Sequence, residues 1–193
     1  VEALPERYKM MALLAAWCAM RFGELAELRR GDMDLRTNRV SITRGVVRVG
    51  GKFVVGSPKS DAGVRDVAIP PHLVPAVKAH LKNHTGKGKD ALLFPAAADS
   101  NAHMAPSTLY KVYYPARKAA GREDLRWHDL RHTGAVLAAQ TGATLAELMG
   151  RLGHSTPGAA MRYQHAAADR DAEIARRLSA LAEVSDPAGR VDR

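Results

Sequence analysis

The stretch from Trp127 to His165 reads WHDLRHTGAVLAAQTGATLAELMGRLGHSTPGAAMRYQH and carries most of the chemical information in the chain. His128 and Arg131 are three residues apart, so they share one face of a helix. His154 follows a glycine-containing turn, and Tyr163 lies nine residues further on. A guanidinium presents a rigid fork of donors to a phosphate, an imidazole donates or shuttles protons, and a tyrosine phenol can attack phosphorus. This order of residues predicts a site for phosphate chemistry that needs no metal.

The composition narrows the class of protein and its partner. A chain of 193 residues is long enough for one domain with a real core. It has 29 Lys and Arg against 20 Asp and Glu, a net charge of +9, which favours a polyanion such as nucleic acid; an unrelated basic protein is the alternative. The single cysteine, Cys18, allows no internal disulfide and fits a reducing compartment. We find no membrane span and no signal peptide, and expect a cytoplasmic protein without a membrane partner.

The pattern along the chain predicts a mainly α fold with a small three-stranded antiparallel sheet, an α+β class. Apolar residues at helical spacing in 5–28 predict two helices, with Pro5 in the first turn and Gly23 between them. Runs rich in β-branched residues predict three strands at 39–49, 52–55 and 64–70, the first two joined by a hairpin at Gly50-Gly51. Further helices are expected at 72–83, at 107–120 with Ser107 as N-cap, three times within 127–165, and at 168–184. The last residues, 185–193, read as a loose tail.

Two residues far from the opening stretch are also candidates. Arg21 interrupts an apolar run, and a buried arginine needs a partner, which Glu24 could be. A structural Arg21–Glu24 pair or a solvated helix end is the alternative interpretation. Lys59 lies in a loop between two predicted strands, from which a lysine can reach a ligand, although most loop lysines are only solvated.

Each histidine and tyrosine in the opening stretch has an ordinary interpretation as well. A lone helical histidine is more often a core or surface residue, and a tyrosine near a helix end usually packs with its hydroxyl hydrogen-bonded. His128 and Arg131 together at the start of a helix are a better anion site, because helix N-termini attract phosphate. The functional interpretation therefore depends on the combination of these residues.

That combination resembles the tyrosine recombinase family, the phage-type integrases. The most specific matches are HDLRHT and LGHSTPGAAMRYQH, with AMRFGELAELRRGDMDL similar to the first arginine box and GSPKSDAGVRDVAIP similar to the lysine hairpin. The resemblance extends over 5–181 and implies a catalytic domain at 1–184. It also implies an N-terminal DNA-binding domain that lies outside this chain. We therefore expect the chain to be a fragment or a processed product. One departure is Ala19, where the family usually has a glycine two residues before its arginine.

The resemblance implies a role for each candidate residue. Tyr163 would attack the scissile phosphate and form a 3′-phosphotyrosyl link, releasing a 5′-hydroxyl. Arg21 and Arg131 would clamp the non-bridging oxygens, and His154 would add a hydrogen bond. Lys59 would protonate the leaving oxygen, and His128 would help to take the phenolic proton. No metal, ATP or other cofactor would be required, because the covalent link conserves the energy of the phosphodiester.

The resemblance also implies partners. The DNA partner is a specific recombination site in double-stranded DNA. The protein partners are further copies of this chain, which form a homotetramer on that DNA and could be monomers when free. The final helix at 168–184 would pack onto a neighbouring protomer or fold back on its own domain.

Three other interpretations remain open from the residues alone. A non-catalytic helix-turn-helix regulator would explain the charge and residues 144–165 but not Arg21 and Lys59. A metal nuclease could use the four histidines of the opening stretch, although they lack a carboxylate pair; these are His128, His132, His154 and His165. A type IB topoisomerase would share the chemistry, but its spacing fits less well.

Overall fold

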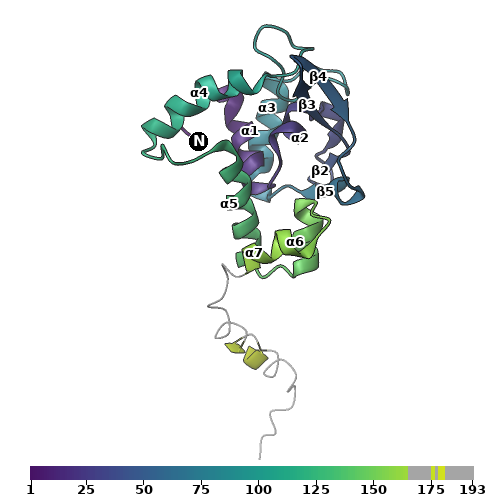
Figure 1. Cartoon of the computed structure of the whole chain (residues 1–193), viewed down its shortest axis with the longest axis vertical. Coiled ribbons are helices and arrows are strands. Elements are labelled where there is room, and N and C mark those ends of the chain that lie inside the picture. Colours follow the sequence, from purple (N-terminus) through teal and green to yellow (C-terminus); the bar gives the residue numbers. More distant parts are fainter. Residues whose placement is uncertain (165–174, 177, 181–193) are drawn as a thin grey trace, which may run out of the picture.

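The structure, a computed structural model, describes residues 1–164, 175–176 and 178–180. Helices dominate it, and two small sheets lie together on one side (Figure 1). Helix α5 (Trp127–Gln140) packs against α1 (Glu6–Trp17) and extends toward α6 and α7, and α6 in turn contacts strand β5 (Arg65–Ala68) (Figure 1). This confirms the mainly α class with a small antiparallel sheet. No helix in the described part of the chain is long and apolar enough to cross a membrane.

The first two helices are confirmed, but the expected break at Gly23 is wrong. Helix α1 ends at Trp17, and α2 (Phe22–Glu27) begins before Gly23 and includes it. The turn instead passes through Ala19, which has a φ of 52°. Gly23 serves packing, because a Cβ there would lie 2.6 Å from the Val46 carbonyl oxygen of the neighbouring hairpin.

The strands form two sheets rather than one. Strands β1 (Met33–Asp34), β2 (Arg39–Ile42) and β5 (Arg65–Ala68) form an antiparallel sheet in the order β1-β2-β5, while β3 (Gly45–Val49) and β4 (Lys52–Gly56) form a separate hairpin. The hairpin turn at Gly50-Gly51 is as predicted, with both φ angles positive. The single strand expected at 39–49 is wrong. Arg44 lies at the break, where its guanidinium bonds Glu27 and Asp32, and β3 beyond it packs on α2 and pairs with β4.

Two helices connect the sheets to the functional region. Helix α3 (Val74–Asn83) follows a 3₁₀ turn at Pro71–Leu73, and α4 is Pro106–Ala119. Both agree with the predicted ranges within the usual uncertainty of helix ends. The N-cap of α4 is Ala105 rather than Ser107, because Pro106 takes the first helical position, where its missing N–H costs nothing.

The opening stretch folds into the three predicted helices. After α5 come α6 (Leu145–Leu152) and α7 (Pro157–Gln164). Thr144 and Glu147 cap α6 reciprocally, and Gly153 ends it with a φ of 62°. A small apolar cluster joins the three helices; it includes Ala135, Leu148, Leu152, Ala160 and Tyr163. The expected helix at 168–184 and tail at 185–193 lie outside the described residues, apart from 175–176 and 178–180.

Candidate functional site

Arg131 is the most buried charged group of the site. It lies on α5 with only 4% of its surface exposed. Its guanidinium donates to the carbonyl oxygen of Ala19, to that of Leu152 at 2.5 Å, and to Nε2 of His154 at 3.2 Å. Burial, and then the positive charge of Arg21, lower the pKa of Arg131 to about 10, so it stays charged at neutral pH. Among the described residues no carboxylate pairs with it, so its charge is not neutralised by an ion pair.

Arg21 approaches the same turn from the start of α2. Its Nη1 donates to Glu24 at 2.7 Å, and its Nη2 donates to the Gly153 carbonyl oxygen at 3.3 Å. The structural Arg21–Glu24 ion pair, which was the alternative interpretation of Arg21, therefore exists. The side chain of Arg21 is nevertheless 39% exposed, so the same guanidinium can reach a ligand.

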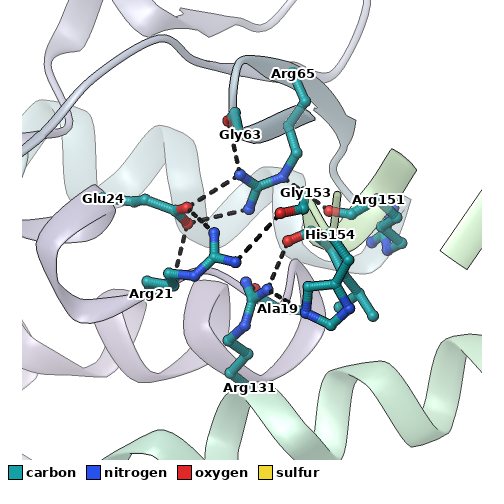
Figure 2. Close-up of polar contacts among 10 residues, drawn as sticks. Ala19, Arg21, Glu24, Gly63, Arg65, Arg131, Arg151, Gly153 and His154 are labelled. Carbon is teal, nitrogen blue, oxygen red and sulfur yellow. Dashed lines mark hydrogen bonds and ion pairs between the residues drawn. The ribbon is translucent and has the colours of Figure 1, made fainter. Parts of the chain in front are cut away.

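Arg65 is a member of this cluster that the sequence pattern did not single out. It lies on β5, and both of its terminal nitrogens donate to Glu24 at 3.0 Å (Figure 2). Its Nε donates to the Arg151 carbonyl oxygen at 2.9 Å, and Nη1 also donates to Gly63. An arginine in the predicted strand VRDVAIP, where β-branched residues predominate, is the one signal in the sequence that marks it.

Within the part of the chain that the structure describes, Glu24 is the one carboxylate that hydrogen-bonds to this arginine cluster. Burial by itself would raise its pKa, but the hydrogen bonds and charges of Arg65 and Arg21 outweigh that effect and hold the pKa below its ordinary value. Glu24 is therefore ionised at neutral pH. One negative charge against Arg21, Arg65 and Arg131 leaves the cluster with excess positive charge, which suits an anionic ligand.

His154 lies directly after Gly153, at the point where the arginines converge (Figure 2). Its Nε2 accepts from Arg131, which requires the ring proton to be on Nδ1. That Nδ1 is buried and has no hydrogen-bond partner within the described part of the chain. Burial, and then the charges of Arg131 and Arg21, lower the pKa of His154 to about 4. The imidazole is therefore neutral at pH 7.

Tyr163 reaches this group of residues from α7. It is 7% exposed, and its ring centroid lies 6.4 Å from that of His154. Its hydroxyl is hydrogen-bonded to Nδ1 of His132 at 2.6 Å. His128, which the resemblance assigns to the phenolic proton, contacts the His132 ring edge to face at 4.7 Å between centroids. The resemblance does not predict this contact of His132, but the position of His132 four residues after His128 places both on one helix face and is the signal that marks it.

Lys59 is exposed on the loop after β4. It shares with Arg21 and Gly153 a cavity of about 750 Å³ that extends under the β3–β4 hairpin. No described residue bonds the Lys59 amine. The structure thus brings Arg21, Arg131, His154 and Tyr163 together, with Lys59 across the cavity and His128 behind His132. No three His, Cys, Asp or Glu side chains of the described residues form a group that could hold a metal ion.

The sequence has close relatives among integrases. The profile of the phage integrase family matches residues 1–170. A prophage phiRv2 integrase of Mycobacterium tuberculosis is 64% identical over 94% of this chain and 48% of its own length. The integrase of Mycobacterium phage D29 is 44% identical over 93% of this chain and 49% of its own length. The chain thus spans about half the length of these relatives.

Solved structures share the fold at lower sequence identity. The Tn1549 transposon integrase in complex with a circular intermediate DNA has a TM-score of 0.71 and 19% identity, covering 82% of this chain and 54% of that one. The XerA recombinase has a TM-score of 0.64 and 23% identity, covering 83% of this chain and 53% of that one. Both likenesses concern the fold. The match of the family profile over most of the sequence, together with the 64% identity to a prophage integrase, establishes that this chain belongs to the phage integrase family.

Proposed function

We propose that this chain is the catalytic part of a site-specific DNA recombinase that cuts and rejoins strands through a 3′-phosphotyrosyl intermediate. The observation that carries the proposal is the buried, unneutralised guanidinium of Arg131 beside Arg21 and His154, next to the helix that bears the tyrosine. A buried charge without a counterion is costly, and a phosphate would supply the missing negative charge.

The roles follow from what each group can do at neutral pH. Arg21 and Arg131 stay charged and can bind the non-bridging oxygens, with most benefit as negative charge grows in the transition state. His154 is neutral, so it acts as a hydrogen-bonding group rather than as a charge. Tyr163 supplies the nucleophile, and Lys59, free of protein partners among the described residues, supplies a proton to the leaving 5′-oxygen. We propose no metal and no ATP in this cycle.

The proposal includes the partners named above. The net charge of +9 supports double-stranded DNA as the ligand. We further propose a homotetramer on DNA, which would bring the two duplexes together for strand exchange. Its assembly can be checked by mass measurement of complexes with one site and with two sites, for the whole chain and for a chain truncated after Ala168. The truncation is expected to weaken two-site complexes more than one-site complexes.

The decisive experiment works even when the target sequence is not known. A pool of nicked duplexes with a randomised core is incubated with the chain in chelator, and protein-linked DNA that resists SDS is isolated and sequenced. A nick near the cut lets the cleaved fragment diffuse away, so the covalent product accumulates. The wild-type chain is expected to form the adduct and Tyr163→Phe is expected to form none.

The same pool should be tested with the remaining segment of the prophage integrase relative fused to the chain, because the chain covers 48% of that protein. An adduct that forms equally with Tyr163→Phe would refute the tyrosine chemistry. If neither the chain alone nor the fused protein forms an adduct, strand cleavage is refuted and only DNA binding remains of the proposal.

A further inference from the structure

The hydroxyl of Tyr163 has one polar side-chain partner in the described part of the chain, and that partner is His132. The distance between the hydroxyl oxygen and Nδ1 of His132 is 2.6 Å. A tyrosine has an ordinary pKa near 10, so as a nucleophile at neutral pH it must lose its proton as it attacks. The group that takes this proton has to lie within hydrogen-bonding distance of the hydroxyl.

We propose that His132 is the group that accepts the Tyr163 proton when the tyrosine attacks phosphorus. This inference rests on the proposed function. In the step, the Tyr163 oxygen forms a bond to phosphorus, the bond from phosphorus to the 5′-oxygen breaks, and the Tyr163 proton moves to Nδ1 of His132. The leaving 5′-oxygen takes a proton from Lys59. On religation the 5′-hydroxyl gives its proton to Lys59 as its oxygen bonds to phosphorus, the bond from phosphorus to the Tyr163 oxygen breaks, and His132 returns its proton to the tyrosine.

Of the described residues, two other histidines lie near the tyrosine, and both are less suited to this role. The Nε2 lone pair of His154 already accepts from Arg131, and the Nδ1 of the same ring carries the proton, so no free acceptor remains. His128 contacts the ring of His132 and not the hydroxyl. His132, in contrast, offers Nδ1 directly to the phenol from the same helix that holds Arg131.

The ring of His132 is held between side chains of α5 and α7. His128 on α5 and Tyr163 on α7 contact this ring, while the charges of Arg131, Arg21 and Arg162 act on the neighbouring histidines His128 and His154. Burial, and then His132 and Arg131, lower the pKa of His128, so His128 is neutral at pH 7 and does not repel a charge on His132. The edge-to-face contact of the two rings also restricts the His132 ring, which keeps Nδ1 directed at the hydroxyl.

Two substitutions separate proton transfer from positioning. In His132→Asn the side-chain oxygen takes the place of Nδ1, so it keeps a hydrogen-bond acceptor for Tyr163 but cannot carry the proton. His132→Ala removes both functions and leaves space for a small base. Cleavage rates are measured on the nicked duplex recovered from the randomised pool, with the 5′-bridging oxygen replaced by sulfur. A thiolate leaves without a proton, so the rate on this substrate does not depend on protonation of the leaving group and reports the loss of the Tyr163 proton.

The expected result is that both His132 variants cut the sulfur substrate about 100-fold or more slowly. Added imidazole should restore His132→Ala, and the recovery should increase with the basicity of substituted imidazoles. His72→Asn, an exposed histidine outside the cluster, is the matched control and is expected to react like the wild type. Thermal unfolding of every variant checks that the fold is retained.

Several results would overturn the assignment. They are His132→Asn reacting within threefold of wild type, His132→Asn reacting faster than wild type, or a slow His132→Ala that no base restores. Base-dependent recovery of His128→Ala instead would transfer the role to His128. These results are distinct from failure of the proposed function, in which the wild-type chain forms no adduct or Tyr163→Phe forms one.

Discussion

Replacing Arg65 by methionine should be among the most destabilising single changes in this protein, although the side chain contacts no reacting atom. Arg65 is 5% exposed and makes four hydrogen bonds, two of them to the carboxylate of Glu24 and two to the carbonyl oxygens of Gly63 and Arg151. Methionine keeps much of the length and apolar volume but makes none of these bonds. Glu24 would then remain buried with only Arg21 to balance it.

The size of the effect follows from that uncompensated charge. Removing one partner of a buried ion pair costs about 3 to 5 kcal/mol of unfolding free energy. Because Arg21 still pairs with Glu24, we expect the lower end, about 3 kcal/mol. For a domain of this size that corresponds to a fall in melting temperature of about 6 to 12 °C. Urea unfolding followed by circular dichroism measures the free energy directly.

Arg122→Met is the matched control for this prediction. Arg122 also makes two hydrogen bonds to one carboxylate, that of Asp124, but both side chains are more than half exposed. Exposed pairs contribute little, so the control should unfold like the wild type. Adding Glu24→Gln to Arg65→Met should recover part of the loss, because it removes the buried charge. A loss below about 1 kcal/mol, or strictly additive effects of the two substitutions, would refute the reasoning.

Three further predictions concern the turn residues and the histidine of the site. Ala19 has a positive φ and is fully buried, so Ala19→Gly should keep its free energy of unfolding within about 1 kcal/mol of wild type, because relief of backbone strain offsets the lost methyl group and the greater freedom of the unfolded chain. Ala19→Val should lose more than about 2 kcal/mol in urea unfolding. Equal stability of the two variants would contradict this. Gly153→Ala should lower the melting temperature and slow adduct formation, since a Cβ would lie 2.9 Å from both the Ala62 carbonyl oxygen and Nη1 of Arg65; an unchanged melting temperature would show that the turn can adapt. The His154 ring should titrate near pH 4 by NMR in the free protein. Because this folded-state pKa lies below the unfolded value of 6.5, the contribution of neutral His154 to stability is present above pH 6.5 and is lost as the pH falls toward 4. His154→Asn should reduce that loss of stability. An NMR titration midpoint of the His154 ring above pH 6 would exclude the lowered pKa.

Much of the fold could be predicted because its signals are local. The helices of 127–164 follow from apolar spacing together with the Thr144–Glu147 cap and the left-handed Gly153, all of which lie within a few residues of the ends they define. The turn at Gly50-Gly51 is local in the same way. The arginine, histidine and tyrosine residues of the candidate site could also be identified from the sequence, since few residue types bind phosphate or react with it. Their order was sufficient to identify the family.

The pairing of distant segments was decided by the tertiary structure. The sequence predicted one sheet, but Arg44 bonds Glu27 and Asp32 and separates β2 from β3. Arg65 joins the cluster because β5 pairs with β2 and directs its guanidinium at Glu24, 41 residues away. The partner of Tyr163 depends on how α7 packs on α5, and a shift of one helix along the other by one turn would present His128 in place of His132. Residue types and local spacing are written in the sequence, whereas strand register and the axial position of packed helices are set by the packing of the whole core, so only the folded structure decides which histidine meets the tyrosine.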